Sequence, residues 1–244
     1  MFARRDPRVD DNEAISWPNP GAVSEVLDEV DSYAIFEAAG VPVAEHAVVT
    51  VGEPCTALPV PGPTVVKILS ADVAHKSDIG GVVLNVQDAR GVRLAIDDIC
   101  VAVSEQAPGI VVDRLVVQSM AHGVGEALVG YRLDADAGPI VLVAAGGVLA
   151  ELYHDRSVRL APVDLDVARE MVAEVVAFRA LDGYRGAPRG DLEALAKAIV
   201  SVSRLALSSG GPIIEAEVNP LLVLRPGEGV VAVDALVRRA VISS

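Results

Sequence analysis

Cysteine, aromatic residues and positive charge are all scarce in this sequence. Two cysteines, Cys55 and Cys100, occur in 244 residues without Cys-x-x-Cys spacing, so we expect reduced thiols in a cytoplasmic chain. Aromatic residues make up only 3%. The formal net charge of −14 argues against nonspecific binding to nucleic acid and to anionic membrane surfaces. An anionic ligand stays possible, because a few local donors and a metal can hold one.

Long hydrophobic runs are also missing. The longest apolar stretch, Ile140 to Leu152, is interrupted by Gly146, Gly147 and Glu151, and it is too short to span a bilayer. The first residues include arginines but no apolar segment of a signal peptide. Yet 52% of the residues are hydrophobic, chiefly Val, Ala and Leu. This composition is typical of buried strands with Ala-rich helices, as in α/β or α+β folds.

Local patterns predict an order of elements without regular β–α alternation. Residues 1–20 are polar and contain three prolines, which predicts a flexible arm. A helix is predicted over 24–40, capped by Ser24 and ended by Gly40. We expect further helices over 88–107, 164–178 and 191–207, with Asp88, Asp164 and Asp191 as caps. Predicted strands cover 41–50, 64–70, 82–86, 114–120, 126–134, 139–147, 148–154, 157–163, 213–224 and 229–237. This order favours α+β lobes over a doubly wound sheet.

Two segments of the first half could contact phosphates. Lys67 lies within an apolar strand and is either an exposed strand lysine or a phosphate ligand in a cleft. The loop His75–Gly81 is either a polar lead-in to a hairpin or a loop that approaches an anion. In the second interpretation, Gly80 and Gly81 bring backbone N–H groups close to phosphate, and a neutral His75 accepts a phosphoryl group.

Acidic and amide side chains near the C-terminus could hold a cation. Glu215, Glu217 and Asn219 alternate along a predicted strand and therefore point to one face, which is either solvated or a ligand set for Mg²⁺. Asp234 lies in a second, apolar strand, where an acid needs a partner or a metal. If the two strands form a hairpin, Asp234 neighbours residues 217–219, and the sequence predicts a metal site there.

Several segments occur together in an order that resembles a known family. VVKILSADVAHKSDIGGVVLNV, GVGEALVGYRLDADAGPIVLVAAGGVLAEL, LDGYRG and EAEVNPLLVL followed by VVAVDA are similar to the ATP-grasp domain of ADP-forming acyl-CoA synthetases. A more distant likeness is to the β subunit of succinyl-CoA synthetase. The resemblance implies an α+β ATP-grasp fold with a nucleotide cleft between an N-terminal lobe, residues 21–115, and a C-terminal lobe, residues 116–244.

The resemblance also implies roles for individual residues. Lys67 would contact the nucleotide phosphates, and His75 would relay a phosphoryl group as a second catalytic residue. The remaining nucleotide-binding positions would be Gly80, Gly81, Gln118, Met120 and Glu126. The Mg²⁺ ligands would be Asn219 and Asp234, with Glu217 close by.

The activity implied is acid + CoA + ATP giving acyl-CoA + ADP + phosphate, through a phosphohistidine. No Gly-x-Gly-x-x-Gly follows a predicted strand, so CoA is expected on a partner α subunit of a hetero-oligomer. Two alternatives stay open: a noncatalytic ATP-binding sensor or assembly subunit, and another ATP-grasp ligase that joins a carboxylate to an amine.

Overall fold

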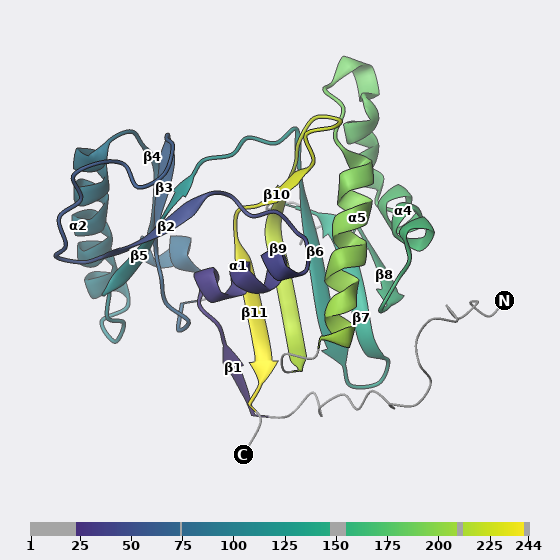
Figure 1. Ribbon diagram of the computed structural model, residues 1–244, viewed down its shortest axis with the longest axis horizontal. Helices are drawn as coiled ribbons and strands as arrows, with labels where there is room; N and C mark the ends of the chain where they lie inside the picture. Colours follow the sequence, from purple (N-terminus) through teal and green to yellow (C-terminus); the bar gives the residue numbers. More distant parts are fainter. Residues whose placement is uncertain (1–22, 74, 147–154, 209–211, 242–244) are drawn as a thin grey trace.

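Two β-sheets, each with its own helices, make up the protein (Figure 1). The computed structural model describes residues 23–73, 75–146, 155–208 and 212–241. The smaller sheet has the antiparallel order β2-β5-β3-β4, with β2 His46–Thr50, β3 Thr64–Ile68, β4 Val82–Val86 and β5 Arg114–Ser119. Helix α2, Ala89–Gln106, packs on it through a buried face of Val92, Ala95, Ile96, Ile99 and Val103.

The larger sheet has the order β1-β11-β9-β6-β7-β8, and β10 also pairs with β9. Its strands are β1 Ser24–Val26, β6 Gly125–Asp134, β7 Gly138–Ala145, β8 Arg156–Leu160, β9 Ile213–Val223, β10 Val230–Ala232 and β11 Ala235–Ala240. Helices α1 Glu29–Ala38, α4 Leu165–Glu174 and α5 Leu192–Ser203 share one hydrophobic core with this sheet. The smaller sheet and α2 have a separate core, so the predicted two-lobed α+β architecture is confirmed.

The three predicted aspartate caps are confirmed. The carboxylates of Asp88, Asp164 and Asp191 accept hydrogen bonds from the backbone N–H three residues later, at 2.7, 2.9 and 3.0 Å. Each bond satisfies a helix N–H that would otherwise lack a partner. No helix in the described part of the chain is both long and apolar enough to cross a bilayer.

The prediction for residues 24–40 is wrong at its start. Ser24–Val26 forms β1, which pairs antiparallel with Arg238–Ala240 of β11. The helix begins only at Glu29, where Asp28 is the cap and its carboxylate accepts from Asp31 N at 2.9 Å. Pairing with a strand more than 200 positions away therefore outweighs the local helical pattern.

Two further predictions differ in detail, and a third is not tested. The strand predicted over 229–237 is two strands, β10 and β11, interrupted at Val233 and Asp234. The helix predicted over 164–178 ends at Glu174 and continues as a 3₁₀ helix over Val176–Asp182. The strand predicted over 148–154 lies outside the described residues.

The strands are also divided between the two sheets differently from the predicted lobes, whose boundary lies between residues 115 and 116. The N-terminal elements β1 and α1 join the larger sheet and its core, whereas all of β5, through Ser119, belongs to the smaller sheet. The chain thus starts in one lobe, crosses to the other and returns. The segments that cross between the lobes bring α1, β3 and the β10–β11 junction together.

The core of the small lobe should depend strongly on Ile99, which is fully buried beneath the smaller sheet. Replacing Ile99 by alanine removes apolar contacts and leaves a cavity, so we expect a loss of about 2–5 kcal/mol in the free energy of unfolding. Urea denaturation followed by circular dichroism measures it. Leu94→Ala is the matched control, because Leu94 lies on the same helix with 52% of its surface exposed. Equal losses in both variants would contradict the packing of α2.

Candidate active site

Two adjoining cavities lie where the lobes meet, and they share His75, Lys76 and Asp234. The small-sheet cavity, about 340 Å³, is lined by Lys67 and by residues of β3, β4 and β5, together with Pro220 and Val233. The large-sheet cavity, about 420 Å³, is lined by Glu29, residues 70–73 and the polar face of β9 and β11. The predicted lysine, histidine loop and C-terminal acid thus face one cleft, although they are far apart in sequence.

Lys67 is held inside this cleft by β3. It is only 7% exposed, so the alternative of an exposed strand lysine is excluded. Its ammonium group crosses to the other lobe, where it donates to Glu29 Oε1 at 2.8 Å and to the carbonyl of Val233 at 2.6 Å. A buried ammonium with two acceptors stays fixed in position, which suits a group that must meet an anion.

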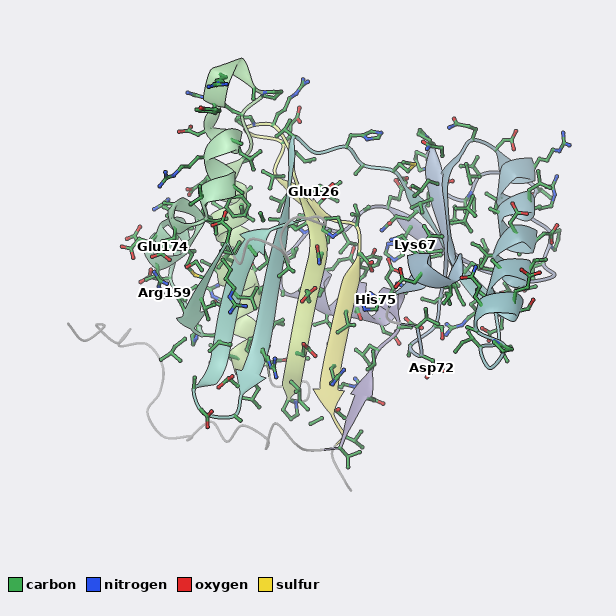
Figure 2. All side chains as sticks on the ribbon, turned by 180° about the vertical axis from the view of Figure 1, so that it is seen from behind. Lys67, Asp72, His75, Glu126, Arg159 and Glu174 are labelled. Carbon is green, nitrogen blue, oxygen red and sulfur yellow. The ribbon has the colours of Figure 1, made fainter. Side chains whose placement is uncertain are left out.

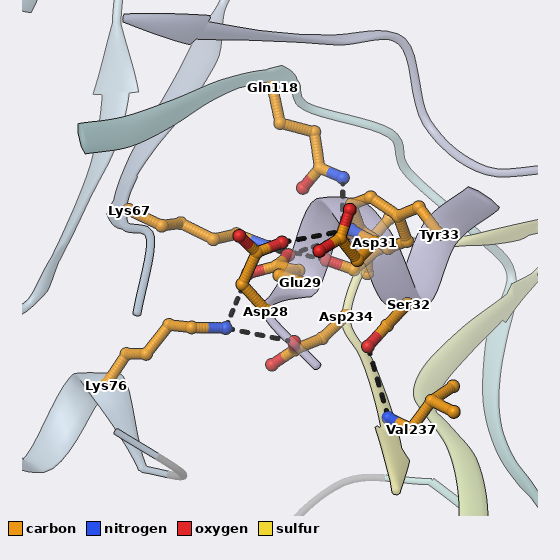
Figure 3. A network of polar contacts seen from close by, with 11 residues as sticks. Asp28, Glu29, Asp31, Ser32, Tyr33, Lys67, Lys76, Gln118, Asp234 and Val237 are labelled. Carbon is orange, nitrogen blue, oxygen red and sulfur yellow. Dashed lines mark hydrogen bonds and ion pairs between the residues drawn. The ribbon is translucent and has the colours of Figure 1, made fainter. Parts of the chain in front are cut away.

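Lys76 reaches the same point from the first residue of the 3₁₀ helix Lys76–Ile79, which follows β3 (Figure 3). Its ammonium lies 2.5 Å from Glu29 Oε2 and 3.5 Å from Asp234 Oδ1. The side chain of Glu29 is fully buried, so its carboxylate is enclosed between the two lysines. Glu29 is the first residue of α1, where the exposed N–H groups of a helix favour a negative charge.

Burial and charge shift the ionisation of these groups. Burial alone would raise the pKa of Glu29, but Lys67 and Lys76 outweigh it and hold this pKa below its ordinary value. Burial would lower the pKa of Lys76, whereas Glu29 and Asp234 raise it above the usual range. Burial and the nearby charge of Glu29 raise the pKa of Asp234. The negative charge of Asp234 is therefore not fully balanced by the lysines, and a cation beside this carboxylate would balance it.

Tyr33 and Gln118 complete what we call the Glu29 network, namely Glu29, Tyr33, Lys67, Lys76, Gln118 and Asp234. The hydroxyl of Tyr33 donates to Glu29 Oε1 and accepts from Gln118 Nε2, the latter at 2.8 Å. Gln118 lines the small-sheet cavity, and its side-chain amide donates to Tyr33 within this network. Met120 lines the same cavity beside Val65, Val82 and Leu84, which form an apolar wall.

His75 stands at the junction of both cavities, immediately before the 3₁₀ helix Lys76–Ile79 (Figure 2). The residue is exposed, and no other residue in the described ranges forms a hydrogen bond with its imidazole. The ring nitrogens are therefore available to a ligand. An accessible imidazole that lines the same cavity as two ammonium groups can act as a nucleophile toward an anionic substrate when it is neutral.

The predicted approach of Gly80 and Gly81 to phosphate is not what the structure shows. Neither residue lines either of the two cavities described above, and their N–H groups already donate to Ser77 O at 3.2 Å and Lys76 O at 2.7 Å. Glycine is required here by packing. A Cβ on Gly80 would lie 2.6 Å from the Cβ of Ala102, and one on Gly81 would lie 2.7 Å from Ile68 Cγ2.

The predicted metal ligands line the large-sheet cavity together. β9 presents Glu215, Glu217 and Asn219 on one face, and Asn219 N donates to the carbonyl of Asp234 at 3.2 Å. No group of three His, Cys, Asp or Glu side chains within the described ranges could hold a metal by itself, so the amide of Asn219 would be needed. The acids of this cavity are Glu29, Asp72, Glu215, Glu217 and Asp234, against the cations Lys76 and Arg238. A surplus of oxygen donors fits Mg²⁺.

Glu126 is not brought to the cleft. It lies on β6 with its side chain exposed, outside both cavities, and its carbonyl accepts from Gly146 N at 2.8 Å. Its predicted contact with the nucleotide therefore has no support in this arrangement. Figure 2 shows it on the larger sheet, apart from Lys67 and His75.

Comparison with known proteins identifies the family of this chain. The profile of the ATP-grasp domain family matches residues 21–238, nearly the whole chain. The chain belongs to the ATP-grasp family.

Three proteins similar to this ATP-grasp chain are named as acetate–CoA ligases or as an acetyl-coenzyme A synthetase. It is 38% identical over 169 residues to an ADP-forming acetate–CoA ligase of Archaeoglobus fulgidus, covering 69% of this chain but only 24% of that relative. It is 33% identical to the β subunit of an ADP-forming acetate–CoA ligase of Pyrococcus furiosus, covering 86% of this chain and 90% of that subunit. Acetyl-coenzyme A synthetase 1 of Ca. Korarchaeum cryptofilum superposes with a TM-score of 0.80 at 30% identity, covering 88% and 93%. A second structure of that synthetase contains coenzyme A and Mg-AMPPCP, with a phosphohistidine segment pointing towards the nucleotide-binding site.

Sequence reasoning assigned no role to Glu29, Lys76 or Tyr33 of this ATP-grasp chain. One signal was present for α1, since the spacing of Glu29, Ser32, Tyr33 and Phe36 is that of a buried helical face. An acid at the start of such a face needs a partner. For Lys76, the signal was its position directly after His75.

Proposed function

We propose that this chain is the nucleotide-binding subunit of an ADP-forming acyl-CoA synthetase, which converts an acid, CoA and ATP into acyl-CoA, ADP and phosphate. The observation that carries the proposal is the convergence of Lys67, Lys76, His75 and Asp234 on one cleft between the lobes. The cleft combines an apolar wall for a base, ammonium groups for phosphates and an accessible imidazole. These are the parts that phosphoryl transfer needs.

In this proposal, the base lies against Val65, Leu84 and Met120, and the phosphates extend toward Lys67 and Lys76. Both ammonium groups neutralise charge that develops on the transferred phosphoryl group. Asp234 and Asn219, with Glu217 near them, would hold Mg²⁺, which neutralises phosphate charge when bound. A neutral nitrogen of His75 attacks the γ-phosphorus, the bond to the bridging oxygen breaks, and ADP leaves with that electron pair. The phosphohistidine then delivers its phosphoryl group toward the acid.

A partner subunit would carry the remaining chemistry. The Pyrococcus relative is named a β subunit, and this chain spans about a quarter of the Archaeoglobus ligase, 24%. We therefore infer that a CoA-binding α subunit completes a hetero-oligomer. Both cysteines are free, which supports our proposal that the enzyme is cytoplasmic.

Reconstitution tests this proposal. The chain is co-expressed with the product of a neighbouring gene that encodes a CoA-binding protein, and ADP formation is measured with CoA and small carboxylic acids. Activity that requires both subunits is the expected result. Full activity of the isolated chain would contradict the two-subunit assembly, and ADP formation that requires an amine instead of CoA would favour a carboxylate–amine ligase.

Asp234→Asn should raise the Mg²⁺ requirement of the assembled enzyme. The substitution keeps the shape of the side chain but removes a charge that would bind the ion, and it leaves Lys76 with Glu29 alone. We expect the Mg²⁺ concentration for half-maximal activity to rise about 10–100-fold, as is typical when the ligand shell of a metal is damaged. Titration of activity with Mg²⁺ after removal of metal by EDTA measures it. Asp136→Asn, on an exposed turn, is the control, and an unchanged requirement in Asp234→Asn would contradict the assignment.

A further inference from the structure

Glu29 links the two lobes, although the proposed reaction assigns it no task. Its helix belongs to the core of the larger sheet through Tyr33 and Phe36. Both lysines that it contacts belong to the small lobe, Lys67 on β3 and Lys76 at the start of the 3₁₀ helix Lys76–Ile79. One buried carboxylate therefore sets where two ammonium groups of the opposite lobe can lie (Figure 3).

The hydrogen bonds leave each lysine one donor to spare. An ammonium group has three N–H bonds. Lys67 uses two, toward Glu29 Oε1 and the carbonyl of Val233, and Lys76 uses two, toward Glu29 Oε2 and Asp234. Both lysines line the small-sheet cavity. Since Glu29 engages each lysine with a different oxygen, it can keep both in place while the third N–H of each meets a ligand.

We propose that Glu29 is a positioning residue for phosphoryl transfer, whose two carboxylate oxygens fix the spacing of Lys67 and Lys76 so that each presents its remaining N–H to the phosphates of the nucleotide. This inference rests on the proposed function and adds to it a residue that touches neither nucleotide nor reacting atoms.

Loss of the Glu29 carboxylate would misplace the two lysines, but it would not prevent a nucleotide from binding in the cleft. Two buried ammonium groups close together repel each other, and Asp234 would be the remaining carboxylate of the Glu29 network. Lys76 would then shift toward Asp234 and compete with Mg²⁺ for it. At the same time the cleft gains one unit of positive charge, which favours an anionic nucleotide. Turnover and nucleotide affinity should therefore change in different directions.

Glu29→Gln in the assembled enzyme tests this separation. We expect kcat for ADP formation to fall about 10²-fold, as for a misplacement of roughly 1 Å at a reacting centre. Calorimetry with Mg-AMPPNP should give a Kd equal to or lower than that of the wild type. Asp31→Asn is the matched control, because it removes the same charge from an exposed position in the first turn of α1. We expect this control to retain wild-type kcat.

Further variants distinguish positioning from a purely structural role. Glu29→Asp keeps the charge but shortens the side chain, so it should fold and still lower kcat without weakening nucleotide binding. In the double variant Glu29→Gln/Lys76→Met, the fold-decrease in kcat should be smaller than the product of the fold-decreases in the two single variants. This is expected because Glu29 acts through Lys76.

Three results would overturn the inference: unchanged kcat in Glu29→Gln, parallel weakening of kcat and nucleotide binding, or failure of both Glu29 variants to fold. If the wild type neither binds Mg-AMPPNP nor forms ADP, the proposed function itself fails and this inference falls with it.

Discussion

His75→Ala is expected to abolish ADP formation by the assembled enzyme while nucleotide binding persists. Alanine cannot accept a phosphoryl group, and loss of a covalent nucleophile typically costs on the order of 10⁴-fold or more in turnover. The fold should be unaffected, since the imidazole is exposed and forms no hydrogen bond within the described residues. Steady-state kinetics, together with calorimetry using Mg-AMPPNP, separates the two effects.

Acid-labile label provides a second measurement for this variant. With γ-³²P-labelled ATP, the wild-type chain should acquire label that is lost in acid and stable in base, and His75→Ala should acquire none. His122→Ala is the control, because His122 is exposed and lines neither cavity. If His75→Ala keeps full activity, the relay role is wrong and a noncatalytic nucleotide sensor becomes the better interpretation. Activity without any labelled histidine would favour the carboxylate–amine ligase.

Lys67→Met should weaken nucleotide binding and slow phosphoryl transfer together. Methionine has nearly the same length but no charge, so the cleft loses a buried cation that is preset for phosphate. Removal of one such fixed electrostatic contact typically costs about 10²–10³-fold in rate. Glu29 would keep Lys76 as a partner, so the carboxylate is not left without compensation. Thermal unfolding should therefore still be cooperative.

The matched control for this change is Lys197→Met, on the exposed side of α5. It removes the same charge from the same chain without touching the cleft, so kcat and Kd should equal those of the wild type. Equal effects of both substitutions would point to the net charge of the protein rather than to a specific contact. Wild-type kinetics in Lys67→Met would remove Lys67 from the site.

Elements fixed by local chemistry could be predicted from the sequence, and those fixed by distant partners could not. Asp88, Asp164 and Asp191 each cap a helix within three residues, so sequence alone identifies them. Ser24–Val26 lies next to a helical pattern, but its hydrogen-bond partners are on β11 near the other end of the chain. No window of sequence contains both strands, which is why the local pattern predicts a helix that begins too early.

The same limit applies to the site. Lys67, His75 and Asp234 stood out because charged or nucleophilic residues in apolar or Gly-rich surroundings need an explanation. Glu29 did not stand out, because only the folded chain brings Lys67 and Lys76 to it from 38 and 47 positions away. The sequence singles out Gly80 and Gly81 for close approach to an anion. The group that approaches is packed protein, Ala102 and Ile68, rather than phosphate.

A crystal structure of the chain with Mg-AMPPNP tests the central claim most directly. We expect the base against Met120 and Leu84, phosphate oxygens at the ammonium groups of Lys67 and Lys76, and the metal between the γ-phosphate and Asp234, with His75 facing that phosphate. A nucleotide bound away from these residues, or an imidazole of His75 turned from the phosphate with no path to it, would contradict the account.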